Sequence, residues 1–356
     1  MQFLYRHSNK KTELKRRKRG DFKISPKLEE LIIQLKIGNK KALYTFLHEI
    51  KSNNTPLIEQ CPIDNQYKLI TYIWLGDRKT ENVYVFGSFP GWDLSVNQLK
   101  RLLQTDIWYQ TFRTDKSFIS TYYFSVNDFF ENDWIKRSEQ YELDRFNGNT
   151  FGEGANKASV LSIGMEVQYS SRFPSNHYPS GKIETHSFHS TILNNTRKIH
   201  IYTPHDYFHT SHPQELLIVF DGNSFIKNLS IAKTLNYTTI SGFSLGGLAA
   251  FYAALQNPHV FGNVLSMSGS VHWKKGGYEN QISSIDSNTS QTHFYIAAGE
   301  LENKPLLTAN RRLYKALKGK GYPNTYEEFQ GAHDGVWWRE KLFDGLKALK
   351  LKKTTL

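Results

Sequence analysis

A serine between glycines has the residue types and spacing of a nucleophile elbow, in residues 242–247 (GFSLGG). The β-prone residues 237–241 precede it and the helix-favouring residues 248–255 follow it, which predicts a strand, a tight turn and a helix. In that setting glycines permit the crowded turn, and the serine hydroxyl stands exposed at the end of a strand. Ser244 is therefore the candidate nucleophile.

A serine hydroxyl is a poor nucleophile at neutral pH, so this interpretation requires a base and an acid that orients the base. His333 lies in a loop, residues 330–335 (QGAHDG), between a strand-like and a helical stretch, and is the candidate base. Residues 292–298 (THFYIAA) predict a buried strand, and Glu300 and Glu302 follow it. The order serine, acid, histidine is typical of the α/β-hydrolase arrangement.

Acyl transfer also needs hydrogen-bond donors for a tetrahedral oxyanion. In this architecture one donor is the backbone N–H after the nucleophile, here Leu245, and another comes from the loop after an earlier strand. The strand predicted over residues 215–221 leads to Gly222 as the second donor, with Asn223 beside it as a candidate substrate-binding residue.

Several of these segments together resemble one known family, the enterochelin esterases, which cut the ester backbone of catecholate siderophores. The matching residues are 242–247, Ala298, Gly299, Glu302, Gly331, His333, Asp334, Trp338 and Arg339, then 216–222 (LLIVFDG), 82–87, 105–108 and 122–124. The resemblance covers most of residues 55 to 350. It implies a serine esterase acting on an anionic siderophore, with iron arriving in the substrate and no cofactor of the protein's own.

The resemblance also bears on individual site residues. It ranks Glu302 before Glu300 as the acid that orients His333. Trp338 and Arg339 match a Trp-Arg pair of the family, for which substrate contact and packing against the histidine loop are both open. Asp334 adjoins His333, and we interpret it as a residue that fixes the loop.

One segment departs from the family pattern. Only residues 223–237 separate the Asp221-Gly222 loop from the elbow strand. Family members carry there a helix, a further parallel strand and another helix. We therefore expect the sheet to lose a strand next to the site, with its neighbours either re-paired or left unpaired.

The predicted fold is α/β, with an α/β-hydrolase domain in residues 159–356, shortened between 222 and 238. Before it, residues 26–158 predict helices followed by a small immunoglobulin-like β-sandwich, because short aromatic and β-branched runs alternate with turn residues. Residues 1–25 predict a basic, disordered tail. A turn signal at residues 193–196 (LNNT), between strand-like residues 181–190 and 197–202, predicts a hairpin that is expected to open the hydrolase sheet.

The chain has 356 residues, a formal net charge of +12 and one cysteine. Residues 1–23 contribute +7 of this charge, and the remaining positive balance favours an anionic small ligand. One cysteine excludes an internal disulfide framework and fits a reducing compartment. No apolar run reaches membrane-spanning length, and no signal-peptide core is found, so we expect a cytoplasmic protein without a membrane span. We expect no nucleic-acid partner.

A metal site is not expected either. His205, His209 and His212 lie close together, but their spacing fits no specific zinc signature.

Three hypotheses for function remain: a siderophore esterase, a generic carboxylesterase or thioesterase, and a non-catalytic siderophore-binding relative whose shortened segment has disabled the hydrolase.

Overall fold

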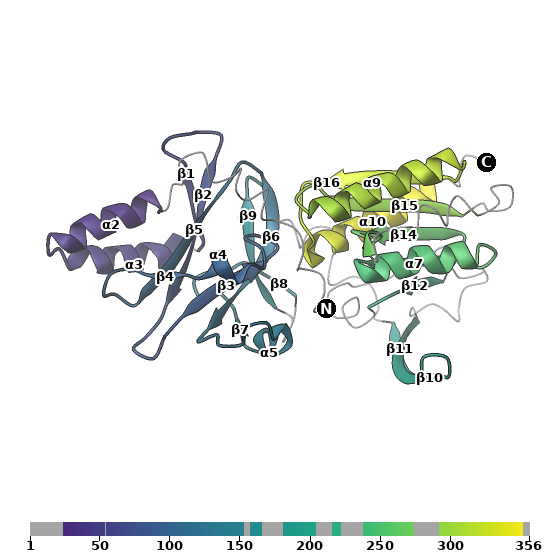
Figure 1. Ribbon diagram of the computed structural model, residues 1–356, viewed down its shortest axis with the longest axis horizontal. Coiled ribbons are helices and arrows are strands. Elements are labelled where there is room, and N and C mark those ends of the chain that lie inside the picture. The colour runs from purple at the N-terminus through teal and green to yellow at the C-terminus, as the bar shows by residue number, and fades with distance from the viewer. Residues whose placement is uncertain are drawn as a thin grey trace. The chain divides into compact units, whose positions relative to one another are not determined.

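The computed structural model describes residues 24–53, 55–152, 157–165, 181–203, 216–221, 238–273 and 292–351. The chain forms two compact units, Met1–Met165 and Glu166–Leu356, coloured purple to teal and teal to yellow in Figure 1. Most of the predicted basic tail lies outside the described residues. Ser25, which the sequence assigned to that tail, instead caps the first described helix, since its buried hydroxyl accepts the Leu28 N–H at 3.2 Å.

The first unit combines helices with antiparallel strands. Its elements are α2 (Pro26–Lys36), α3 (Lys41–Asn53), β1 (Leu57–Gln60), β2 (Lys68–Leu75), β3 (Val83–Gly87), α4 (Leu94–Asn97), β4 (Lys100–Arg101), β5 (Ile107–Thr114), β6 (Phe118–Val126), α5 (Trp134–Glu139), β7 (Tyr141–Glu142), β8 (Thr150–Phe151) and β9 (Ala158–Ile163). One sheet has the order β1-β2-β5-β4, and the other β3-β6-β9-β8 with β7 beside β6. Aromatic rings of the two sheets touch, as between Tyr72 and Tyr122, whose centroids lie 4.9 Å apart. The immunoglobulin-like class of this unit stays a prediction.

The end of the first unit lies later than the sequence indicated. The predicted boundary follows residue 158, but β9 pairs with β6 as far as Ile163, opposite Phe118. Strand β9 therefore belongs to the first unit, which ends at Met165. The turn signals around residues 148–158 mark a connection inside that unit.

The second unit contains the elements that position the candidate site. They are β10 (Lys182–Ser190), β11 (Asn195–Thr203), β12 (Leu217–Val219), β13 (Thr239–Phe243), α7 (Leu245–Gln256), β14 (Asn263–Met267), β15 (His293–Gly299), α9 (Lys304–Gly319), β16 (Asn324–Phe329) and α10 (Gly335–Leu351). Strands β12 to β16 form one parallel sheet in chain order. Because its strands run the same way, the residues that follow them meet at one edge of the sheet.

Helices cover both faces of this sheet, and successive strand residues point to opposite faces. Val264 of β14 packs in a cluster with apolar residues of α7 and α9. The next residue, Leu265, packs in another cluster with residues of α10. Strands β14 and β15 are buried at every position, as expected for the centre of a parallel sheet covered on both sides.

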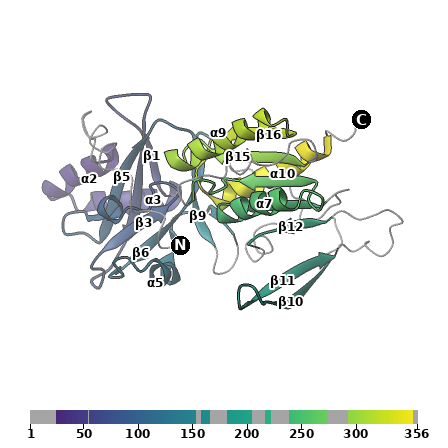
Figure 2. The ribbon, with the colours of Figure 1, turned by 45° about the vertical axis from the view of Figure 1, so that its right-hand side comes forward.

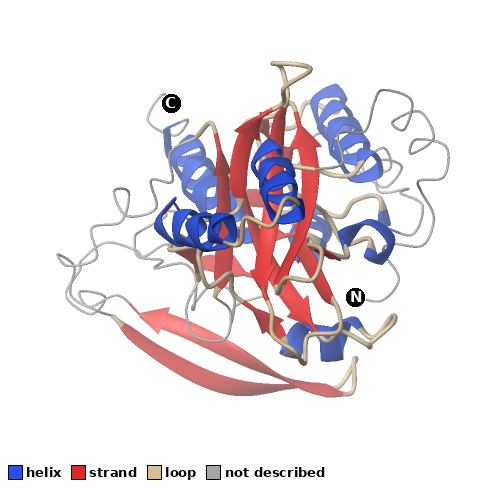
Figure 3. Ribbon diagram, turned by 90° about the vertical axis from the view of Figure 1, so that its left-hand side faces the viewer, coloured by secondary structure: helices blue, strands red, loops and turns tan. Residues whose placement is uncertain are grey.

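The hairpin of β10 and β11 forms within the predicted residues 181–202, but its turn is residues 191–194, two residues earlier than predicted. The expectation that it opens the hydrolase sheet is wrong. Among the described residues the two strands pair only with each other, and β12 is the end strand of the parallel sheet (Figure 2). In Figure 3 the hairpin is the separate pair of strands below the main sheet. Without a sheet neighbour, apolar side chains such as Ile199 and Ile201 remain about half exposed. The predicted loss of a strand within residues 223–237 falls outside the described residues and stays a prediction.

The turn from β13 into α7 requires glycine at its first position. A Cβ on Gly242 would lie 2.4 Å from both the carbonyl carbon and the oxygen of Gly246. Backbone atoms cannot move aside as a flexible side chain can, so the first turn of α7 approaches β13 this closely only when Gly242 has no side chain.

We therefore expect Gly242→Ala to destabilise the protein by roughly 1–3 kcal/mol, as overpacking does. Gly319→Ala is the control, because a Cβ there meets no heavy atom within 4 Å. It should leave stability within about 1 kcal/mol of the parent chain. Chemical denaturation of the two variants measures the difference, and equal midpoints would contradict the close approach at Gly242.

Candidate active site

Ser244 lies in the turn between β13 and α7 with φ 55° and ψ −123°. Its N–H donates to the Met267 carbonyl at 3.0 Å, and its carbonyl accepts the Ser270 N–H at 2.9 Å. Both bonds tie the turn to the end of β14. A positive φ in a residue with a side chain costs free energy, on the order of 1–3 kcal/mol, and occurs where surrounding structure enforces it.

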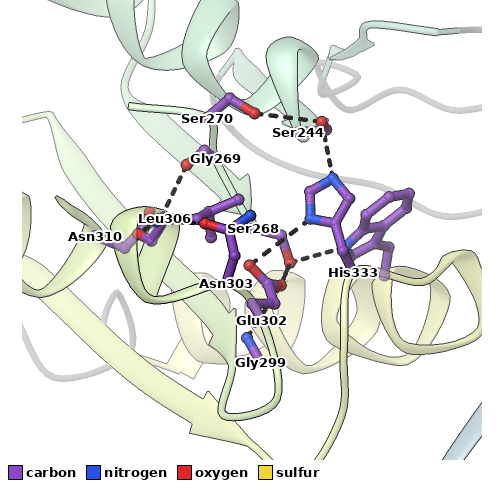
Figure 4. A network of polar contacts seen from close by, with 11 residues as sticks. Ser244, Ser268, Gly269, Ser270, Gly299, Glu302, Asn303, Leu306, Asn310 and His333 are labelled. Carbon is purple, nitrogen blue, oxygen red and sulfur yellow. Dashed lines mark hydrogen bonds and ion pairs between the residues drawn. The ribbon is translucent and has the colours of Figure 1, made fainter. Parts of the chain in front are cut away.

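His333 reaches this serine from the loop between β16 and α10. Its Nε2 atom lies 2.9 Å from Ser244 Oγ (Figure 4). The loop is fixed by the next residue, since buried Asp334 accepts the Val336 N–H at 3.1 Å through its carboxylate. These contacts agree with the loop-fixing role predicted for Asp334. The imidazole is 36% exposed, so a substrate can reach it.

Glu302 lies on the other side of the imidazole, in the turn after β15. Its carboxylate is fully buried, and Oε2 lies 3.7 Å from His333 Nδ1. Its Oε1 atom accepts the Gly299 N–H at 3.2 Å and a hydrogen bond from the Ser268 hydroxyl. Glu300, the alternative acid, is exposed at the surface of the same turn. The structure therefore brings Ser244, His333 and Glu302 together.

This arrangement can perform general base chemistry on the serine. Neutral His333 can accept the Ser244 proton at Nε2, and the negative charge of Glu302 stabilises the resulting imidazolium. The 3.7 Å contact is an ion-pair distance and exceeds a hydrogen bond. Such contacts commonly tighten in complexes with substrate.

The predicted oxyanion donors are only partly within the described residues. Leu245 is the first residue of α7, where backbone N–H groups have no intrahelical acceptor. Gly222 and Asn223 lie outside the described residues, so their predicted roles stay predictions. Asp221, just before them, has φ 59°, and burial raises the pKa of its carboxyl group.

Serines of the segment after β14 also reach the site, and the sequence analysis did not single them out. Ser270 Oγ lies 3.3 Å from Ser244 Oγ, and Ser268 contacts Glu302. Only their position in the sequence could have indicated a place in the site. They follow the buried strand that comes after the elbow helix, and the ends of parallel strands meet at one edge of the sheet. Nearby, burial lowers the pKa of His272, and the positive charge of protonated His333 lowers it further.

Trp338 lies inside the cluster. Its ring stacks on Phe243, with centroids 4.1 Å apart, and meets His333 edge-on at 4.8 Å. Its indole N–H donates to Ser268 Oγ at 2.8 Å. These contacts favour the second alternative for Trp338, packing against the histidine loop. Arg339 follows on α10, partly buried, and its substrate-binding role stays a prediction.

The described part of the chain contains no group of three or more potential metal ligands. The three clustered histidines of the sequence, His205, His209 and His212, lie outside it. No helix within the described ranges is both long and apolar enough to cross a membrane.

Ser244 lies in a turn between a strand and a helix and contacts an imidazole, and the fold is mixed α/β. These features place the protein in the class of candidate serine hydrolases.

Comparison with known proteins supports this class. Residues 231–349 match a family model described as putative esterase. An iron(III) enterobactin esterase of Escherichia coli is 35% identical over 115 residues, and one of Dickeya dadantii is 32% identical over 127 residues. These alignments cover 31% and 32% of the chain, and 28% and 29% of the relatives.

A longer but more distant similarity extends over both units. An iron(III) salmochelin esterase of Escherichia coli is 21% identical over 403 residues, covering 89% of the chain and 96% of the relative. The solved enterochelin esterase of Shigella flexneri superimposes with a TM-score of 0.61 at 19% identity, covering 83% of the chain and 95% of that structure. The fold is therefore shared with that structure. Together the comparisons confirm the resemblance to the enterochelin esterase family.

The contact between Glu302 and His333 predicts a specific loss of activity. Glu302→Gln removes the negative charge while keeping the side-chain size, so the imidazolium loses its stabilisation. We expect kcat for ester hydrolysis to fall roughly 10²- to 10⁴-fold.

Glu300→Gln is the matched control, because it makes the same substitution at an exposed position in the same turn. Its kcat should stay within about twofold of the parent chain, as for a surface change. A larger loss in Glu300→Gln than in Glu302→Gln would reverse the assignment of the acid.

Proposed function

We propose that the protein is a serine esterase that hydrolyses the ester backbone of a ferric catecholate siderophore and releases iron inside the cell. The observation that carries this proposal is the 2.9 Å contact between His333 Nε2 and Ser244 Oγ at the end of β13. The relatives supply the substrate class, since their names specify enterobactin and salmochelin. The positive charge that remains outside residues 1–23 favours an anionic ligand of that kind.

The proposed reaction begins with attack of Ser244 Oγ on an ester carbonyl, while His333 accepts the serine proton. The N–H groups of Leu245 and Gly222 stabilise the oxyanion. His333 then returns the proton to the leaving hydroxyl, and an acyl-enzyme remains on Ser244. Water attacks the acyl-enzyme with His333 again as base, which frees the acid and regenerates the serine. Glu302 stays ionised throughout.

The same proposal includes the fold of each of the two units and the location of the protein in the cell. The parallel sheet with Ser244, Glu302 and His333 in chain order supports an α/β-hydrolase domain. Two antiparallel sheets in contact support a β-sandwich before it. The proposed cytoplasmic location rests on the single cysteine, which fits a reducing compartment. Iron is part of the substrate in this scheme, and the protein itself needs no cofactor.

One observation favours a non-catalytic relative as the second candidate. The hairpin of β10 and β11 pairs with no other described strand, and β12 is short and ends the sheet. The 403-residue span of the salmochelin esterase alignment exceeds the 356 residues of the chain, so some positions of that relative have no counterpart here. The missing strand would border the oxyanion loop, and its loss can abolish turnover while leaving siderophore binding intact. A generic carboxylesterase or thioesterase is the other alternative.

Turnover of three substrates separates these candidates. The purified protein is incubated with ferric enterobactin, iron-free enterobactin and a short p-nitrophenyl ester, and products are followed by chromatography. We expect hydrolysis of enterobactin, and in Ser244→Ala a fall in kcat of about 10³-fold or more, since the nucleophile is gone. Binding of ferric enterobactin, measured by quenching of tryptophan fluorescence, should persist in that variant.

Other results identify the alternatives. Efficient cleavage of the p-nitrophenyl ester alone would indicate a generic esterase. Binding without any turnover by the parent chain would indicate the non-catalytic relative. Equal turnover by the parent chain and Ser244→Ala would exclude Ser244 as the nucleophile.

A further inference from the structure

Ser268, the residue that follows β14, has an unusual and firmly held backbone. Its φ is 50°, which few residues with a side chain adopt, and it is completely buried. Its N–H donates to the Ala297 carbonyl of β15 at 2.7 Å. This bond ties Ser268 to β15, the strand that leads into the turn with Glu302.

The direction of the hydrogen bonds at Ser268 follows from chemistry. The indole N–H of Trp338 is a donor only, so at 2.8 Å the Ser268 oxygen must be its acceptor. The hydroxyl proton of Ser268 is then available for its second contact, with Glu302 Oε1. An ionised carboxylate accepts only, so both bonds point toward Glu302.

This orientation leaves one carboxylate oxygen of Glu302 for the imidazole. Oε1 receives two donors, the Ser268 hydroxyl and the Gly299 N–H. Oε2 is the atom that faces His333 Nδ1 at 3.7 Å. The carboxylate has no exposed surface, so these donors replace the water that would otherwise stabilise its charge. Without Ser268, the carboxylate would lose a donor and its fixed rotamer.

Trp338 joins the same chain of contacts from α10. The indole packs on Phe243, the neighbour of the nucleophile, and against the edge of His333. Its single polar atom is used by Ser268 and is therefore not free to bind a substrate. From the sequence, both substrate contact and packing were open for Trp338, and these contacts favour support of the acid and the base.

We propose that Ser268 is a positioning residue that acts through Glu302, with Trp338 holding the Ser268 hydroxyl in its donating direction. The proposal rests on the proposed function of Ser244, His333 and Glu302. It requires that the contribution of Ser268 to reactivity disappears when Glu302 is absent. A residue that merely stabilises the fold would contribute equally in both backgrounds.

The test uses a readout that does not depend on the siderophore. The rate constant for labelling of Ser244 by a fluorophosphonate probe reports activation of the serine directly. It is measured for Ser268→Ala, Glu302→Ala and the double variant, together with kcat and KM for the p-nitrophenyl ester and the thermal midpoint of each protein.

We expect Ser268→Ala to lower the labelling rate and kcat roughly 10- to 100-fold, the value of a hydrogen bond to a charged group. KM should change less than about twofold, because the loss is in activation of the serine and not in binding. In the Glu302→Ala background the same substitution should have no further effect. Trp338→Phe keeps a ring but removes the indole N–H, so it should lower the rate by a smaller factor and add nothing to Ser268→Ala.

Ser266→Ala is the matched control. Ser266 is another fully buried serine, inside β14 and two residues before Ser268, and its hydroxyl has no hydrogen-bond partner in the described part of the chain. Its labelling rate should equal that of the parent chain. An equal loss for Ser268→Ala with and without Glu302, or no loss in the parent background, would overturn the proposal. If the parent chain itself does not label at Ser244, the proposed function fails first, and the positioning role fails with it.

Discussion

The hydrogen bond between His333 Nε2 and Ser244 Oγ joins residues 89 positions apart in the chain, and the rest of the candidate site is arranged around it. It forms because β13 and β16 belong to one parallel sheet, whose strand ends lie on a common edge. Burial of that sheet between α7 and α9 on one face and α10 on the other fixes the edge. Local turns then set each side chain, so the chemistry depends on the core as much as on the loops.

Features that are encoded locally could be predicted from the sequence. The elbow at Ser244 was recognisable because glycines, a strand signal and a helix signal are contiguous there. The loop position of His333 and the acidic turn after β15 followed from short patterns of the same kind. The resemblance to a family ranked Glu302 before Glu300, and the structure places Glu302 beside the imidazole and Glu300 in solvent.

Features that depend on distant contacts could not be predicted in the same way. Nothing in the residues around Ser268 indicates that its hydroxyl meets a carboxylate 34 positions later and an indole 70 positions later. The hairpin of β10 and β11 was predictable from local signals, but its separation from the parallel sheet was not. The same holds for the first unit, whose end is set by pairing of β9 with β6 rather than by the turn signals before it.

The backbones of Ser244 and Ser268 share a feature with a consequence for evolution. Both residues have a positive φ, and they follow neighbouring strands of the sheet. Glycine would adopt these conformations at lower cost. Selection for thermal stability alone would therefore favour glycine at both positions, at the expense of the two hydroxyl groups. If both hydroxyls serve catalysis, the two serines lower the free energy of unfolding relative to glycine but make the site reactive. Variants selected only for heat resistance will therefore tend to lose function at these two positions first.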